Sequence, residues 1–136
     1  MHPVTAKTPR QRPQFRNIHV FDLRHYRLPA AGLVSILHRV SGAVLFLAMV
    51  WLLFLLDRSL SSEAGFESVK RYASFPVVKA ALLLMIWCYC HHFCAGIRFL
   101  FLDIDKGVDK ETARLTSIVV IVAGLVLTAL FGARLL

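Results

Sequence analysis

The sequence predicts an all-α membrane protein with three transmembrane helices, and three observations lead to this fold class. First, 57% of the 136 residues are hydrophobic and the mean hydropathy is +0.64, which is too apolar for a water-soluble chain of this length. Second, the apolar residues lie in long runs that charged segments separate. Third, three of these runs approach or exceed the roughly 20 residues that cross a hydrocarbon core of about 30 Å.

The N-terminal segment, residues 1–27, is expected to be a basic cytoplasmic arm. The net charge of the chain is +8, and much of the basic excess comes before the first span or just inside it. The residues concerned are Lys7, Arg10, Arg12, Arg16, Arg24, Arg27 and Arg39, against the single acid Asp22. The positive-inside rule then places the N-terminus in the cytoplasm.

The same arm indicates where the protein resides and what it contacts. Its 27 residues contain no apolar stretch of the kind that a cleavable signal peptide needs. The arm is also short for a mitochondrial transit peptide, so a bacterial inner (cytoplasmic) membrane is the simplest location. We expect the basic residues to contact lipid headgroups or a partner subunit. We expect no binding to nucleic acid, since the sequence lacks an aromatic and basic RNA motif.

Residues 28–136 are predicted to form a transmembrane anchor domain. The spans we expect are residues 28–56, 77–102 and 115–133. Pro29 can open the first helix and Pro76 the second, because proline fits the first turn of a helix. The charge at Asp57 ends the first span, and the outer-side loop that follows contains a candidate short helix at residues 66–72.

The first span carries a polar cluster near its cytoplasmic boundary. Ser35, His38 and Arg39 fall at positions i, i+3 and i+4, so they share one face of the helix, and Gly42 continues that face with a gap. A guanidinium in this position can pair with a carboxylate such as a haem propionate, and a hydroxyl with a cation can bind a quinone carbonyl. The alternative is structural: Arg39 snorkels to the headgroups and His38 bonds a neighbouring carbonyl.

Two adjacent histidines, His91 and His92, lie inside the second span. Successive helical residues point about 100° apart, so the two rings cannot serve one site. A porphyrin needs a small residue one turn from its ligand. Gly96 is that residue for His92. Ala95 is in the corresponding position for His91 and leaves less room. The pattern therefore favours His92 as a haem ligand and keeps His91 as an alternative; a histidine bonded to a neighbouring helix also remains open.

A six-coordinate haem b with two histidines needs a second axial ligand. Within the spans the other candidates are His38, which looks too shallow, and His91, which faces elsewhere. We therefore expect the second ligand to come from another chain, so that this chain forms half of a heterodimeric haem-binding helix bundle. Three cysteines of the second span, Cys88, Cys90 and Cys94, follow no zinc pattern and are expected to be buried free thiols.

Two separated motifs resemble the cytochrome b subunit of succinate dehydrogenase. Residues 35–42 resemble its Ser-x-x-His-Arg-x-[Ser/Thr]-Gly signature. Residues 92–98 followed by Asp103 resemble its His-x-x-x-Gly-x-Arg-His-x-x-x-Asp motif, except that Phe99 occupies the position of the second histidine. The resemblance covers about residues 27–103, with the third span matched by position alone.

The resemblance implies a cofactor, partners and residue roles. His92 would be the axial ligand of haem b, His38 and Arg39 would lie near the haem propionates, and Ser35 and Arg39 would help to bind ubiquinone. The partners would be a second small membrane anchor subunit, an iron–sulfur subunit and a flavoprotein subunit that oxidises succinate. The chain would not be catalytic alone.

Two other functions stay open at this point. One is the anchor of a related fumarate reductase or b-type electron-transfer complex, although many of these hold two haems and need four histidines in their spans. The other, from a different class, is a small membrane adaptor that binds no haem.

Overall fold

The computed structural model describes Phe21, His25 and residues 27–134, so most of the predicted arm at residues 1–27 lies outside the described residues. Within the described part the chain folds into helices alone. Their order is α1 (Ala30–Ser61), α2 (Glu63–Ala73), α3 (Pro76–Asp103) and α4 (Lys110–Gly132). The long apolar helices α1, α3 and α4 can each cross a membrane by length and composition, which confirms the predicted three-span, all-α fold class.

The first span is longer than predicted. Helix α1 begins directly after Pro29, whose extended backbone caps it, but it continues to Ser61 instead of ending at Leu56. The hydroxyl of Ser59 donates to the carbonyl of Leu56 at 2.8 Å, and that of Ser61 donates to the carbonyl of Asp57 at 2.6 Å. Both hydroxyls bond back to carbonyls of their own helix, and α1 ends where the backbone of Ser62 becomes extended.

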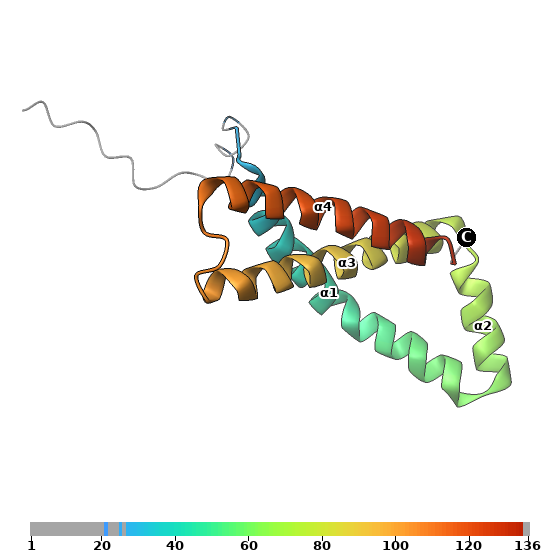
Figure 1. Ribbon diagram of the computed structural model, residues 1–136. Coiled ribbons are helices and arrows are strands. Elements are labelled where there is room, and N and C mark those ends of the chain that lie inside the picture. Colours follow the sequence, from blue (N-terminus) through green and yellow to red (C-terminus); the bar gives the residue numbers. More distant parts are fainter. Residues whose placement is uncertain (1–20, 22–24, 26, 135–136) are drawn as a thin grey trace, which may run out of the picture.

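Helix α2 confirms the short helix predicted between the first two spans, and it extends a few residues beyond residues 66–72 at its N-terminal side. Ser62 caps it by accepting a hydrogen bond from the amide of Gly65 at 3.0 Å. In Figure 1, α2 bridges the ends of α1 and α3 that lie farthest from the α3–α4 loop. We call that side the α2 end of the bundle, and the opposite side the loop end.

The third span begins earlier than predicted. Pro76 is the first residue of α3, as expected, but α4 starts at Lys110 and not at Leu115. The side chain of Asp109 accepts a hydrogen bond from the amide of Thr112 at 2.9 Å, and this cap lets the charged residues form the first helical turns. Hydrogen bonds from Thr112 hold the pKa of the Asp109 carboxyl below its usual value.

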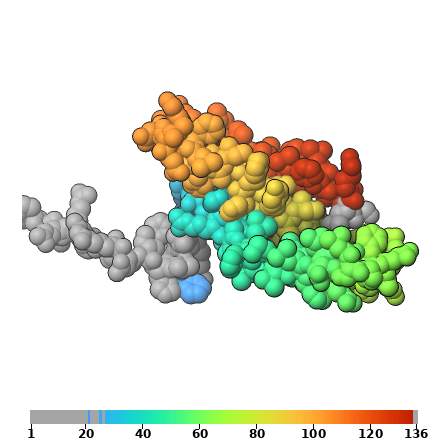
Figure 2. All heavy atoms as spheres, turned by 90° about the horizontal axis from the view of Figure 1, so that it is seen from below, coloured from blue at the N-terminus to red at the C-terminus, as the bar shows by residue number. Residues whose placement is uncertain are grey.

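The helices pack at the loop end around a small core of Val34, Ala95 and Val120, one residue from each span. Helix α3 lies between α1 and α4 there, whereas α1 diverges towards α2 (Figures 1 and 2). The diverging part of α1 exposes large apolar side chains, among them Phe46 and Leu47, which are 71% and 75% exposed. Such an apolar outer surface is suited to lipid or to other membrane helices and not to water.

Candidate functional site

Two histidines from different spans meet where α1 crosses α3. The ring centroids of His38 and His92 are 4.1 Å apart and the rings are nearly parallel, with an interplanar angle of 7°. Both side chains are half-buried. The sequence argument put His38 nearer the membrane boundary than His92, but the crossing of the helices brings the two rings to the same level.

The hydrogen bonds around His92 fix which ring nitrogen carries the proton. Its Nδ1 lies 3.1 Å from the backbone carbonyl oxygen of His38 and 3.4 Å from the hydroxyl of Ser41. A carbonyl oxygen only accepts, so Nδ1 carries the hydrogen and Nε2 keeps its lone pair. Among the described residues, both hydrogen-bonding contacts of the ring use Nδ1.

Ser41 strengthens this arrangement and was not singled out from the sequence. Its side chain is 1% exposed, and its hydroxyl donates to the carbonyl of His38 at 3.0 Å. The signal was present in the sequence, because Ser41 follows His38 by three positions and therefore lies on the same face of α1.

Two glycines border the paired rings. A Cβ atom added to Gly42 would lie 2.8 Å from Cε1 and 3.2 Å from Nδ1 of His92, so only glycine allows the ring this close. A Cβ atom added to Gly96 would lie 3.7 Å from Nε2 of His38, which is ordinary contact. The gap expected at Gly42 thus accommodates the imidazole of α3.

Phe99, at the position where the motif that this segment resembles has its second histidine, also reaches this site. Its ring centroid lies 5.0 Å from that of His38 at 50°, and the guanidinium carbon of Arg98 lies 5.6 Å from the Phe99 centroid. Phe99 therefore packs against the edge of the paired histidines without adding a polar group.

The two remaining candidates of the first span stay on the outside of the pair. Ser35 is half-buried and Arg39 is exposed. No hydrogen bond or ion pair joins either of them to another residue in the part of the chain that the structure describes. Ser35, His38 and Arg39 thus form a polar region of α1 that includes one of the paired rings, and the exposed Arg39 lies at its outer side.

His91 points into the bundle, away from His92. It is 1% exposed, its ring stacks on that of Trp87 with centroids 5.5 Å apart, and it hydrogen-bonds the backbone of Val34. A Cβ atom on Gly124 would come within 3.3 Å of the His91 Cα, so α4 covers it closely. Its Nε2 has no hydrogen-bond partner among the described residues.

The cysteines of α3 are free, as expected: Cys88 and Cys90 are buried and Cys94 is half-buried. Within the described residues, no group of three or more histidine, cysteine or acidic side chains is placed to hold a metal ion.

Comparison with known proteins links this arrangement to one family. The family model described as "Succinate dehydrogenase/Fumarate reductase transmembrane subunit" matches residues 9–131. A succinate dehydrogenase cytochrome b556 subunit from Rickettsia prowazekii is 32% identical over 108 residues, which cover 77% of this chain and 82% of that protein.

Two further relatives carry the same name. The cytochrome b556 subunit of Coxiella burnetii is 30% identical over 82% of this chain and 90% of its own length. That of Paracoccus denitrificans is 30% identical over 79% of this chain and 83% of its own length. The similarity therefore extends over most of each protein and is not confined to the two motifs.

Proposed function

Because the chain belongs to the succinate dehydrogenase/fumarate reductase transmembrane subunit family, we propose that it holds one side of a haem b and contributes to the ubiquinone-reduction site of succinate:quinone oxidoreductase. The family membership makes it a membrane anchor of that complex. The haem contacts, the quinone site and the partner subunits are the parts that we propose here.

One observation carries the haem proposal: Nδ1 of His92 bonds the His38 carbonyl, which leaves the lone pair of the ring on Nε2. Histidines that bind metals usually donate their other ring N–H to a carbonyl or carboxylate, and this fixes the tautomer of the ligand. Gly42 lets the His92 ring pack closely on α1, and Gly96, one helical turn from His92, is the small residue that a broad, flat group beside the ring would need. These residues fit a haem, which when bound would supply one-electron redox chemistry.

The second axial ligand is proposed to come from the second anchor subunit. A haem b held by two histidines would need a ring nitrogen from each of them. His38 and His92 stack face to face in this chain, and His91 is enclosed by its own chain. The part of α1 that diverges from α3 (Figure 1) exposes apolar side chains such as Phe46 and Leu47, on which helices of such a partner could pack.

We propose that the polar residues of α1 bind two groups. His38 and Arg39 would contact the haem propionates, and Ser35 and Arg39 would contact the quinone. The guanidinium of Arg39, exposed at the side of the paired rings, can bind a haem propionate or a quinone carbonyl oxygen with charge-assisted hydrogen bonds. The Ser35 hydroxyl can donate a hydrogen bond to the other carbonyl oxygen of the quinone. As the quinone gains electrons, the positive charge of Arg39 stabilises the oxygen that becomes negative.

The remaining subunits would lie at the loop end, which we propose to face the cytoplasm of a bacterium. The basic arm precedes α1 at that end, in agreement with the positive-inside rule. A flavoprotein that oxidises succinate and an iron–sulfur protein that carries its electrons would then deliver them near the start of α1, where Ser35 and Arg39 lie.

Purification of the affinity-tagged chain from its native membrane tests this function. We expect a flavoprotein, an iron–sulfur protein and a second small membrane protein to co-purify, with a b-type reduced-minus-oxidised spectrum and succinate-dependent ubiquinone reduction. Haem without succinate oxidation would favour another b-type electron-transfer complex. A complex with no b-type absorption would contradict the proposal and favour a membrane adaptor.

A further inference from the structure

A second site lies on the opposite side of α3, in a groove between α3 and α4. The groove has a volume of about 530 Å³ and is separate from the paired histidines, which lie between α1 and α3. Its walls are mainly apolar, with residues such as Phe101, Leu115 and Val119, and its two charged members are Arg98 and Lys106.

Arg98 is a cation in an apolar setting. Its side chain is 6% exposed. Nε donates to the hydroxyl of Thr116 at 3.1 Å, and one terminal nitrogen donates to the carbonyl of Ala113 at 3.3 Å. Both acceptors are neutral, and the one ion pair within the described residues is Lys70–Glu67, at the α2 end.

The guanidinium therefore has capacity for a further partner. It carries five N–H donors, and the recorded bonds of Arg98 use two of them. A charge that is buried in a membrane protein is costly unless it is paired. An anion in the groove could accept hydrogen bonds from the remaining N–H donors of Arg98 and pair with its positive charge.

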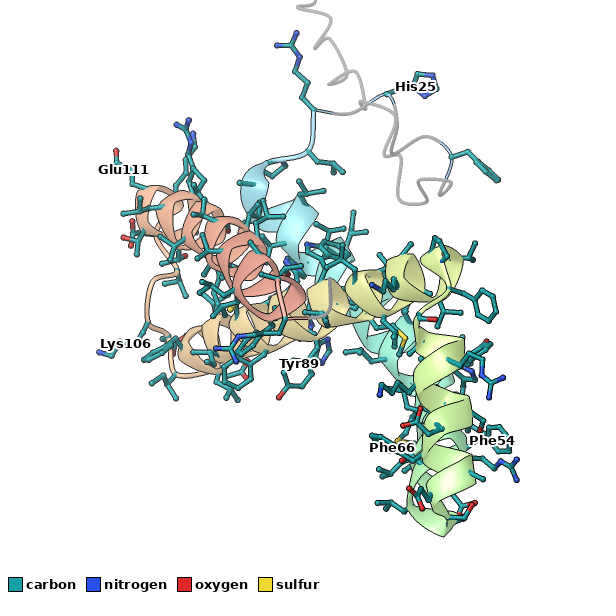
Figure 3. All side chains as sticks on the ribbon, turned by 90° about the vertical axis from the view of Figure 1, so that its right-hand side faces the viewer. His25, Phe54, Phe66, Tyr89, Lys106 and Glu111 are labelled. Carbon is teal, nitrogen blue, oxygen red and sulfur yellow. The ribbon has the colours of Figure 1, made fainter. Side chains whose placement is uncertain are left out.

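The groove also has one polar end and one apolar end. Along the helices, the lining runs from Lys106 and Gly107 of the α3–α4 loop, past Arg98, to Ala123 in α4; we call the loop side the mouth of the groove and the Ala123 side its deep end. Figure 3 shows the side chain of Lys106 extending outward from that loop. The helix rises about 16 Å from the level of Thr112 to that of Ala123, which matches one leaflet of a hydrocarbon core of about 30 Å.

We propose that this groove binds an anionic membrane phospholipid. The phosphate would lie between Lys106 and Arg98, and one acyl chain would follow the apolar wall towards Ala123. Basic pockets between transmembrane helices are suited to such headgroups. The acidic residues of the same end, including Asp105 and Glu111, do not line the groove, so the phosphate would meet cations alone there.

Lipid retention by the purified complex tests this proposal. The complex is exchanged into nanodiscs of phosphatidylcholine alone or mixed with phosphatidylglycerol, and the lipids that stay bound are counted by native mass spectrometry. We expect selective retention of phosphatidylglycerol, reduced about tenfold in Arg98→Gln or Lys106→Gln. Equal retention of the two lipids, or no loss in either variant, would overturn the proposal.

A second variant, which fills the groove, keeps the proposal testable if Arg98→Gln fails to fold. Ala123→Phe fills the deep end and leaves both cations in place, and Val122→Phe, on the adjacent outward face of α4, is its matched control. We expect Ala123→Phe alone to release the lipid while the haem spectrum stays unchanged. Retention in both variants would count against an acyl chain in the groove.

The occupant itself is identified by a photoreactive amino acid at Val119, which lines the groove. We expect the cross-linked product to contain phospholipid. A product that joins this chain to another subunit, or one that contains quinone, would assign the groove to that partner and overturn the proposal.

Discussion

Replacing Gly42 by alanine tests the packing of the proposed haem ligand. The added Cβ would lie 2.8 Å from Cε1 of His92, so the ring must retreat by about 0.7 Å to reach an ordinary contact of ~3.5 Å. That movement stretches the 3.1 Å bond between Nδ1 and the His38 carbonyl. Overpacking costs about 1–3 kcal/mol, and a lost hydrogen bond costs about 1 kcal/mol.

Alanine also favours a helix over glycine by up to about 1 kcal/mol, so the net loss is about 1–3 kcal/mol. This corresponds to haem retention that is roughly 5- to 150-fold weaker. The rate of haem transfer from the purified complex to apomyoglobin measures it, together with the spectrum of the remaining haem. The control is Gly32→Ala on the same helix, where the added Cβ would meet Pro29 at an ordinary 3.6 Å. Equal haem loss from the two variants would refute the packing argument.

Three other substitutions probe separate parts of the account. Arg39→Gln should raise the KM for ubiquinone about 10- to 150-fold, the value of a lost charge-assisted hydrogen bond, while the b-type spectrum remains; an unchanged KM would remove Arg39 from the quinone site. His91→Leu should leave the haem spectrum intact and lower the thermal midpoint modestly, because it removes the bond to the Val34 backbone, worth about 1 kcal/mol, together with a buried Nε2 that has no partner among the described residues; haem loss would instead point to His91 as a ligand. The ionised Asp109 cap should protect the Thr112 amide from hydrogen exchange at pH values above the usual pKa of the carboxyl. This protection should be lost as the pH falls through the lowered pKa. Asp109→Ala should abolish the pH dependence of exchange at Thr112; if the pH dependence persists in the variant, another group causes it.

The spans could be predicted from composition because the lipid environment demands long, apolar, internally bonded helices. The helix ends were less predictable, because they depend on single side chains. Asp109 starts α4 early through a capping hydrogen bond, and α1 ends at the extended backbone of Ser62; hydropathy registers neither feature. The short helix α2 was predictable from its position between Ser62 and the proline that opens α3.

The candidate site was predictable in part. Helical spacing alone put His91 and His92 on different faces, and the structure has one inside the bundle and one towards α1. The close packing of His92 on Gly42 and the buried hydroxyl of Ser41 were not foreseen, because they depend on where α1 and α3 cross. A single sequence does not reveal that crossing.

The most direct test of the proposed haem site is electron paramagnetic resonance of the assembled complex carrying His92→Ala, with and without added imidazole. The account predicts loss of the low-spin haem signal in the variant and its recovery when imidazole enters the space left by the ring, whereas His91→Ala keeps the signal throughout. An unchanged low-spin signal in His92→Ala would contradict the assignment of His92 as the haem ligand.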